Sequence, residues 1–223
     1  MDPARRRRKQ RHRMQLMSGF AVITVAALLL IAHLVMVMNR LPGAVRLSAS
    51  TSNSAHTISD GSTGLTLRLL SSPWRNGCPM RDYPVNWTTG EGAKAGQAPA
   101  GAGRGHSVDW YANACVGLLP GNMQSGNLSK EAANAANAID TDKAISHKRT
   151  VTGSGAIRVN GHRAWKVTFD VHYPGQHLAW SSEAGAMVVV DRGAGQAPAV
   201  FYVSAPSNLG GAATVSTLIS SLR

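Results

Sequence analysis

Residues 157–173 have the sequence IRVNGHRAWKVTFDVHY, which contains the clearest strand signal in the chain. After Asn160-Gly161 an apolar residue recurs at every second position: Trp165, Val167, Phe169, Val171 and Tyr173. This alternation predicts a strand that buries one of its faces. Because Asn-Gly tolerates the positive φ angles of a tight type I′ turn, we expect residues 157–173 to form an antiparallel hairpin.

Apolar segments on both sides of this hairpin predict further strands. They lie at 65–69, 85–87, 108–119, 187–190 and 200–203. In the first, Leu65, Leu67 and Leu69 alternate with polar residues, which indicates one buried face. The last two are continuously apolar, which is typical of central strands that are covered on both faces.

Two segments carry apolar residues at helical spacing. The first, 128–139, is rich in alanine, with Asn127 or Ser129 placed to cap its start. The second follows Asn208, which we expect to be its N-cap, and ends near Leu222. Since each helix needs an apolar surface to cover, we predict an α+β fold in which helices pack on a single antiparallel sheet.

The segment 90–105 is rich in glycine and alanine, and its composition predicts an exposed, mobile loop. Its Gly101-x-Gly103-x-Gly105 pattern lacks both the spacing and the following apolar helix of a dinucleotide-binding loop. We therefore expect no cofactor there.

The segment Ser18–Met38 contains no Asp, Glu, Lys or Arg and is long enough, as a helix, to cross the lipid bilayer. It exceeds the apolar core of a cleaved signal peptide, so an uncleaved signal anchor is predicted. Residues 1–17 would be a basic cytoplasmic tail, residues 39–61 a flexible linker and residues 62–223 an extracytoplasmic domain. The positive-inside rule gives this orientation, with the N-terminus in the cytoplasm.

The formal net charge of +12 is concentrated near the N-terminus, since residues 1–13 hold seven Lys and Arg and one Asp. A basic tail suits nucleic acid as well as anionic lipid. This one adjoins the predicted span and has no interleaved aromatic residues, so we expect the membrane as its partner and no nucleic acid.

The two cysteines, Cys78 and Cys115, both follow the predicted span. An oxidising compartment would allow them to form a disulfide. The alternative is a pair of free, buried thiols. Their separation excludes CxxC redox or zinc chemistry.

Several of these features together resemble the secreted or membrane-anchored actinobacterial proteins of the LpqN/LpqT type, whose fold is similar to PsbP and to the Mog Ran-binding proteins. The matching features are GLTLRL at 64–69 with Pro73-Trp74, the helix 128–139, the strand pair around Asn160-Gly161, the strand 200–203 and the closing helix. The resemblance implies a binding or scaffolding module of the cell envelope without a common catalytic set. Two departures are the span, which stands where those proteins carry a lipobox cysteine, and the insertion at 90–105.

Motifs of known catalytic chemistry are not found: the sequence has no HExxH, GxSxG, SxxK or Walker loop. We therefore predict no catalytic, cofactor-binding or metal-binding residue. One alternative is an envelope hydrolase or metal-binding protein that uses the region of His162, Asp170, His172 and His177. Imidazole and carboxylate ligands suit Zn²⁺ or Cu²⁺, although a solvated sheet face explains the same pattern. Ser181 and Ser182 lie near His177, without a sign of activation.

The expected function is that of a single-pass membrane protein which presents a non-catalytic binding or interaction domain at the cell envelope. Its partner would be a protein of an envelope or secretion-system assembly, a lipid or an anionic wall polymer.

Overall fold

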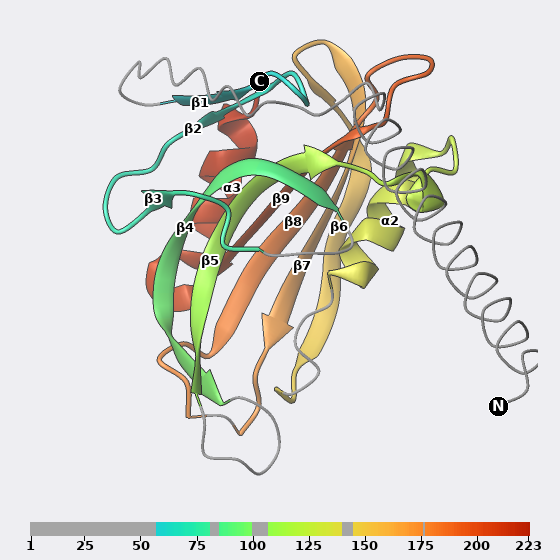
Figure 1. Ribbon diagram of the computed structural model, residues 1–223. Coiled ribbons are helices and arrows are strands. Elements are labelled where there is room, and N and C mark those ends of the chain that lie inside the picture. Colours follow the sequence, from blue (N-terminus) through green and yellow to red (C-terminus); the bar gives the residue numbers. More distant parts are fainter. Residues whose placement is uncertain (1–56, 81–84, 100–106, 140–144, 176) are drawn as a thin grey trace, which may run out of the picture. The chain divides into compact units, whose positions relative to one another are not determined.

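The computed structural model describes residues 57–80, 85–99, 107–139, 145–175 and 177–223, which belong to the unit formed by residues 51–223 (Figure 1). The predicted tail, the predicted span and most of the predicted linker lie outside these residues. In the part of the chain that is described, no helix is both long and apolar enough to cross a membrane.

Seven antiparallel strands form the main sheet, in the order β3-β4-β5-β9-β8-β7-β6 (Figure 1). Their bounds are β3 Arg75–Asn76, β4 Asn86–Pro99, β5 Ser107–Leu118, β6 Lys148–Val159, β7 His162–His172, β8 Ser182–Val190 and β9 Ala199–Pro206. A second sheet pairs β1 (Thr57–Asp60) with β2 (Leu65–Arg68). The predicted α+β class with a large antiparallel sheet is confirmed, and this small second sheet was not expected.

The hairpin predicted from residues 157–173 is formed by β6 and β7. Asn160 and Gly161 have φ angles of 48° and 81°, as a type I′ turn requires, and Val159 pairs with His162 across them. Along β7 the side chains of Val167, Phe169 and Val171 are buried while the intervening residues are not fully buried.

One helix covers each face of the main sheet (Figure 1). Helix α2 (Leu128–Ala138) packs its alanines on a core that includes Val167, Phe169, Met187, Val189 and Val200. Helix α3 (Gly211–Ser221) packs Val215 and Leu218 on the opposite face, against a core that includes Val188, Val190, Phe201 and Val203. All eight residues of β9 are buried, as the continuous apolarity of 200–203 predicted.

The loop predicted for 90–105 is wrong where the structure describes it, because residues 90–99 complete strand β4. Glycine is required at positions 90 and 92 because neighbouring atoms leave no room for a Cβ. A Cβ on Gly90 would lie 2.3 Å from the carbonyl oxygen of Ala114 in β5, and one on Gly92 would lie 2.3 Å from the ring of Pro79. These glycines suggested a flexible loop in the sequence, but in the structure they allow β4 to pack closely against its neighbours.

The two helix starts differ from one another. Asn127 caps α2 as predicted, because its Oδ1 accepts hydrogen bonds from the amides of Ser129 and Lys130. Asn208 was wrongly predicted to cap the last helix. It lies in the 3-10 turn η2 (Ser207–Leu209), its Nδ2 donates to the Ala95 carbonyl at 2.8 Å, and Gly210 is the N-cap of α3.

The predicted linker, 39–61, is too long at its C-terminal end, since Thr57–Asp60 form β1. This strand has one apolar residue, so it shows no alternation. Hydrogen bonds fix it instead: the Asp60 carboxylate accepts from the hydroxyl groups of Ser62, Thr63 and Thr88. On the other side of β2, Thr66 exchanges two backbone hydrogen bonds with Arg223.

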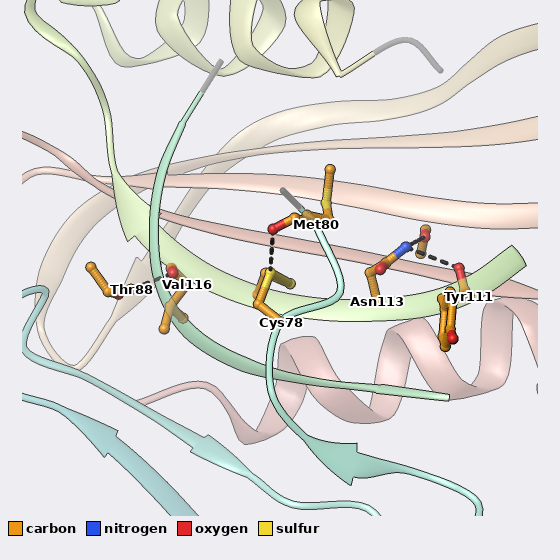
Figure 2. Close-up of a disulfide and its surroundings, with 8 residues drawn as sticks. Cys78, Met80, Thr88, Tyr111, Asn113 and Val116 are labelled. Carbon is orange, nitrogen blue, oxygen red and sulfur yellow. Dashed lines mark hydrogen bonds between the residues drawn. A yellow bond between two sulfur atoms is a disulfide. The ribbon is translucent and has the colours of Figure 1, made fainter. Parts of the chain in front are cut away.

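The disulfide between Cys78 and Cys115 is formed, with the two Cα atoms 5.3 Å apart (Figure 2). Cys115 lies in β5 and is fully buried, whereas Cys78 belongs to the segment between β3 and β4. The bridge therefore fastens this connecting segment to the sheet. The alternative of two free thiols is excluded.

Candidate functional site

A glutamate is buried where polar groups gather at one end of the main sheet. Glu183 is the second residue of β8, stands between Val171 of β7 and Pro206 of β9, and is 4% exposed. It shares its sheet face with Met187 and Val189, because side chains alternate along a strand. The same alternation that buries Met187 and Val189 therefore also buries the Glu183 carboxyl on the α2 side of the sheet.

Three protein groups donate hydrogen bonds to this carboxyl. The indole Nε1 of Trp110 lies 3.0 Å from its Oε2, and the hydroxyl of Tyr173 lies 2.9 Å from the same oxygen. The Ser204 hydroxyl also bonds the carboxyl, and the Asn113 Nδ2 lies 3.2 Å from the Ser204 Oγ. Figure 2 shows Asn113 donating in addition to the carbonyl of Tyr111. The donors come from β5, from β9 and from the residue that follows β7, so the network connects these three parts of the chain to β8.

The pKa of Glu183 is raised above its usual value, because burial disfavours the charged carboxylate. The hydrogen bonds from Ser204, Trp110 and Tyr173 oppose this shift, as does the charge of His147. The His147 ring lies against Tyr173, with ring centroids 6.3 Å apart. The polar partners thus offset part of the free-energy cost of burying the Glu183 carboxyl.

Three aromatic rings pack beside the carboxyl. The rings of Trp110 and Trp180 stack with centroids 5.9 Å apart, and Tyr173 meets both edge-on at 6.0 and 6.4 Å. Gly96 in β4 makes room for them, because a Cβ there would lie 2.9 Å from the Trp180 ring. The Trp180 side chain is buried, and its Nε1 has no acceptor among the residues that the structure describes.

An open cavity of about 510 Å³ adjoins this cluster. Its lining residues are Tyr173, Leu178, Ala179, Trp180, Ser181, Ser207 and Asn208. They come from the segment that connects β7 to β8 and from η2. None of them is charged, and hydroxyl, amide and aromatic groups predominate. This chemistry suits an uncharged polar ligand.

A second buried carboxyl lies on the α3 side of the sheet. Glu91 of β4 is 1% exposed, and its two oxygens lie 3.1 and 3.3 Å from the backbone nitrogen of Leu70, which donates to them. Burial raises the pKa of Glu91 to about 7, and the Leu70 amide opposes this shift. No charged partner is recorded for it within the described chain.

The histidines and the aspartate of the alternative site are not brought together. His162 and His172 are the first and last residues of β7 and so lie about 33 Å apart at ~3.3 Å per residue. Asp170 is on the same strand near His172, and His177 lies in the connecting segment beyond it. Among the described residues no group of three His, Cys, Asp or Glu side chains could hold a metal ion.

The serines near His177 differ in their surroundings. Ser181 lines the cavity and Ser182 begins β8. Glu183, by contrast, was one carboxylate among several in the sequence, with nothing to mark it as buried. The available signal was an acidic residue placed two and four positions before Gly185 and Met187 in an inward-facing row. The contribution of Trp110 and Ser204 depends on the order of the strands, which the sequence does not reveal.

No model of a known protein family matches this chain, and no sequence among the curated proteins matches it. In structure, the chain is similar to the cyanobacterial PsbP (CyanoP) from Synechocystis sp. PCC 6803, with a TM-score of 0.44 and 10% sequence identity. The match covers 75% of this chain and 90% of that one. It concerns the fold alone, and membership of the actinobacterial LpqN/LpqT type stays a prediction.

Proposed function

We propose that this protein is a single-pass membrane protein whose extracytoplasmic domain binds an uncharged polar ligand without transforming it. The ligand would occupy the cavity beside Tyr173, Trp180 and Asn208. The observation that carries the proposal is the hydrogen-bonded Glu183 network, which fixes the aromatic wall of a cavity lined by uncharged polar groups.

The unpaired donor of Trp180 supports ligand binding. A buried N–H without an acceptor costs about 1–3 kcal/mol, so native proteins rarely keep one. Because the Nε1 atom itself is buried, a ligand with a carbonyl or hydroxyl oxygen would recover that cost only if the indole turned toward the cavity on binding. Saccharides with N-acetyl groups offer such oxygens together with apolar ring faces that pack on aromatic side chains.

The environment of Glu183 supports binding over catalysis. A general acid or base must reach the reacting atoms of its substrate. The Glu183 carboxyl is 4% exposed and already accepts hydrogen bonds from Trp110 and Tyr173. Its role in this proposal is to position these two rings.

The disulfide and the sequence support a location outside the cytoplasm. Disulfides persist in oxidising compartments, and Cys78 and Cys115 are bridged. The apolar segment 18–38 and the cations before it provide an anchor and an orientation.

Calorimetry of the full chain in lipid nanodiscs, titrated with N-acetylglucosamine oligomers, tests the ligand class. We expect saturable binding that Ala179→Leu, which narrows the cavity, weakens at least tenfold. Trp180→Phe removes the indole donor and should weaken binding about tenfold. The matched control is Ala213→Leu on the exposed surface of α3. Absence of binding, or equal binding by Ala179→Leu, contradicts the ligand class.

Reporter fusions at Arg223 test the location. A phosphatase that is active only outside the cytoplasm should be active there, and a fluorescent protein that matures only in the cytoplasm should stay dark. The reverse pattern, or a mature chain that starts beyond Arg40, contradicts the anchored topology.

A further inference from the structure

We infer that the outer edge of β6 binds an extended, acidic segment of a partner protein, which joins the main sheet as an eighth strand. β6 stands at one end of the seven strands, and within the described chain it pairs with β7 alone (Figure 1). The inference does not involve the cavity at Trp180, so either proposal can fail without the other.

The edge is long and accessible. β6 has twelve residues, of which seven are exposed, and its Val151 side chain is 53% exposed. An edge strand presents a row of backbone N–H and C=O groups that another strand can pair with. An added strand would satisfy these groups and cover Val151.

The opposite end of the sheet is closed by comparison. There β3 pairs with Glu91 and Gly92 of β4, the amide of Gly77 donates to the Gly90 carbonyl, and Asn208 donates to the Ala95 carbonyl. Described segments of the chain therefore cover part of that edge, whereas the outer edge of β6 pairs with no described strand.

The charge of the β6–β7 hairpin selects the partner. It carries five basic residues and one acidic residue, namely Lys148, Arg149, Arg158, Arg163, Lys166 and Asp170. Three of the cations have internal partners: Arg149 donates to the Ala136 carbonyl at 2.6 Å, Arg158 donates to the Gly161 carbonyl at 2.8 Å, and Arg163 pairs with Asp191 at 2.6 Å. Lys148 and Arg158, near the two ends of β6, are exposed, and the carbonyl partner of Arg158 is uncharged, so both cations can attract carboxylates.

The same charges disfavour a second copy of this chain as the occupant. In an antiparallel pair of two β6 strands, Lys148 of one copy would approach Arg158 of the other at both ends. Like charges on facing positions destabilise strand pairing. An acidic strand reverses the sign of both contacts, while its backbone supplies the main-chain hydrogen bonds of strand addition.

Amide hydrogen exchange of the full chain in nanodiscs tests the inference. The probe is a ten-residue peptide of alternating valine and threonine with two glutamates at each end. We expect exchange within residues 148–159 to slow at least tenfold at saturating peptide. A peptide with lysines in place of the glutamates, and one with two central prolines, should give no protection. The double variant Lys148→Glu/Arg158→Glu should bind the acidic peptide at least tenfold more weakly.

A pair of proline variants separates edge binding from loss of folding. Neighbouring residues of an edge strand point their N–H groups alternately toward the partner strand and toward solvent. Of Thr150→Pro and Val151→Pro, one should therefore keep the wild-type melting temperature yet lose peptide binding. The inference is overturned if that variant binds normally, if protection falls outside β6, or if sedimentation shows a dimer with β6 already protected.

Discussion

At the scale of single residues, Glu91 makes the folded chain sensitive to pH. Burial raises its pKa to about 7 from the ordinary 4.5, so the folded state binds the proton more tightly than the unfolded state. The stability is therefore greatest while the group is protonated in both states. The free energy of unfolding falls by up to about 3 kcal/mol as pH rises from about 4.5 to about 7, and it then levels off.

The variant Glu91→Gln should remove this dependence, because an amide does not ionise and its oxygen can still accept from the Leu70 amide. We expect the variant to be more stable than wild type at pH 8 and similar to it at pH 5. Melting temperatures of the full chain across this range provide the measurement. Asp109→Asn, which changes an exposed carboxyl paired with Lys94, is the control. An unchanged pH profile in Glu91→Gln would contradict the assignment.

The contacts of Gly90 predict a second residue effect. A Cβ at this position would lie 2.3 Å from the Ala114 carbonyl oxygen, which is backbone and has no room to move. Gly90→Ala should therefore lower the free energy of unfolding by at least about 2 kcal/mol. Gly155→Ala in β6 is the matched control, since no atom lies within 4 Å of its added Cβ. That variant should be neutral or stabilising by about 0.5–1 kcal/mol, as chemical denaturation can show.

At the scale of elements, the two asparagines near the helix starts should respond differently to the same substitution. Asn127 accepts hydrogen bonds at the start of α2, and an aspartate accepts equally well, so Asn127→Asp should change stability by less than about 0.5 kcal/mol. Asn208 donates to the Ala95 carbonyl, and an aspartate cannot, so Asn208→Asp should cost about 1–2 kcal/mol. Urea unfolding of both variants is the measurement. Equal effects would mean that Asn208 acts as a cap after all.

The elements also show where prediction from sequence ends. The Asn-Gly turn, strand β7 and α2 were predictable because a turn dipeptide, alternation and an N-cap are local signals, whereas residues 148–156 of β6 were not predicted. The start of β4 was predicted in the segment 85–87, but its continuation through residues 90–99 was missed. Its glycines are required by contacts with Ala114 and Pro79, which local sequence does not reveal. The Glu183 site was missed for the same reason: Trp110 is 73 residues away, and only the order of the strands makes it a neighbour.

At the scale of the whole molecule, the disulfide joins β5 to the segment that precedes β4. The two cysteines are separated by 37 positions in the sequence, and the chain-entropy model assigns the closure of such a loop about 3–4 kcal/mol. The double variant Cys78→Ala/Cys115→Ala should lose a comparable amount, measured by denaturation of the full chain. Reductant should lower the melting temperature of the wild type and leave the variant unchanged. A reductant-insensitive wild type would contradict this role.

The pairing of Thr66 with Arg223 places strand β2 beside the segment that follows α3, and Thr57 and Arg223 border the same surface hollow. The two ends of the described chain therefore lie close to each other. A short glycine-serine bridge from Arg223 to Thr57, with new ends cut at the Asn160-Gly161 turn, should yield a circular permutant that keeps the native circular dichroism spectrum. Such a rearranged chain would present β6 and β7 as its two free ends.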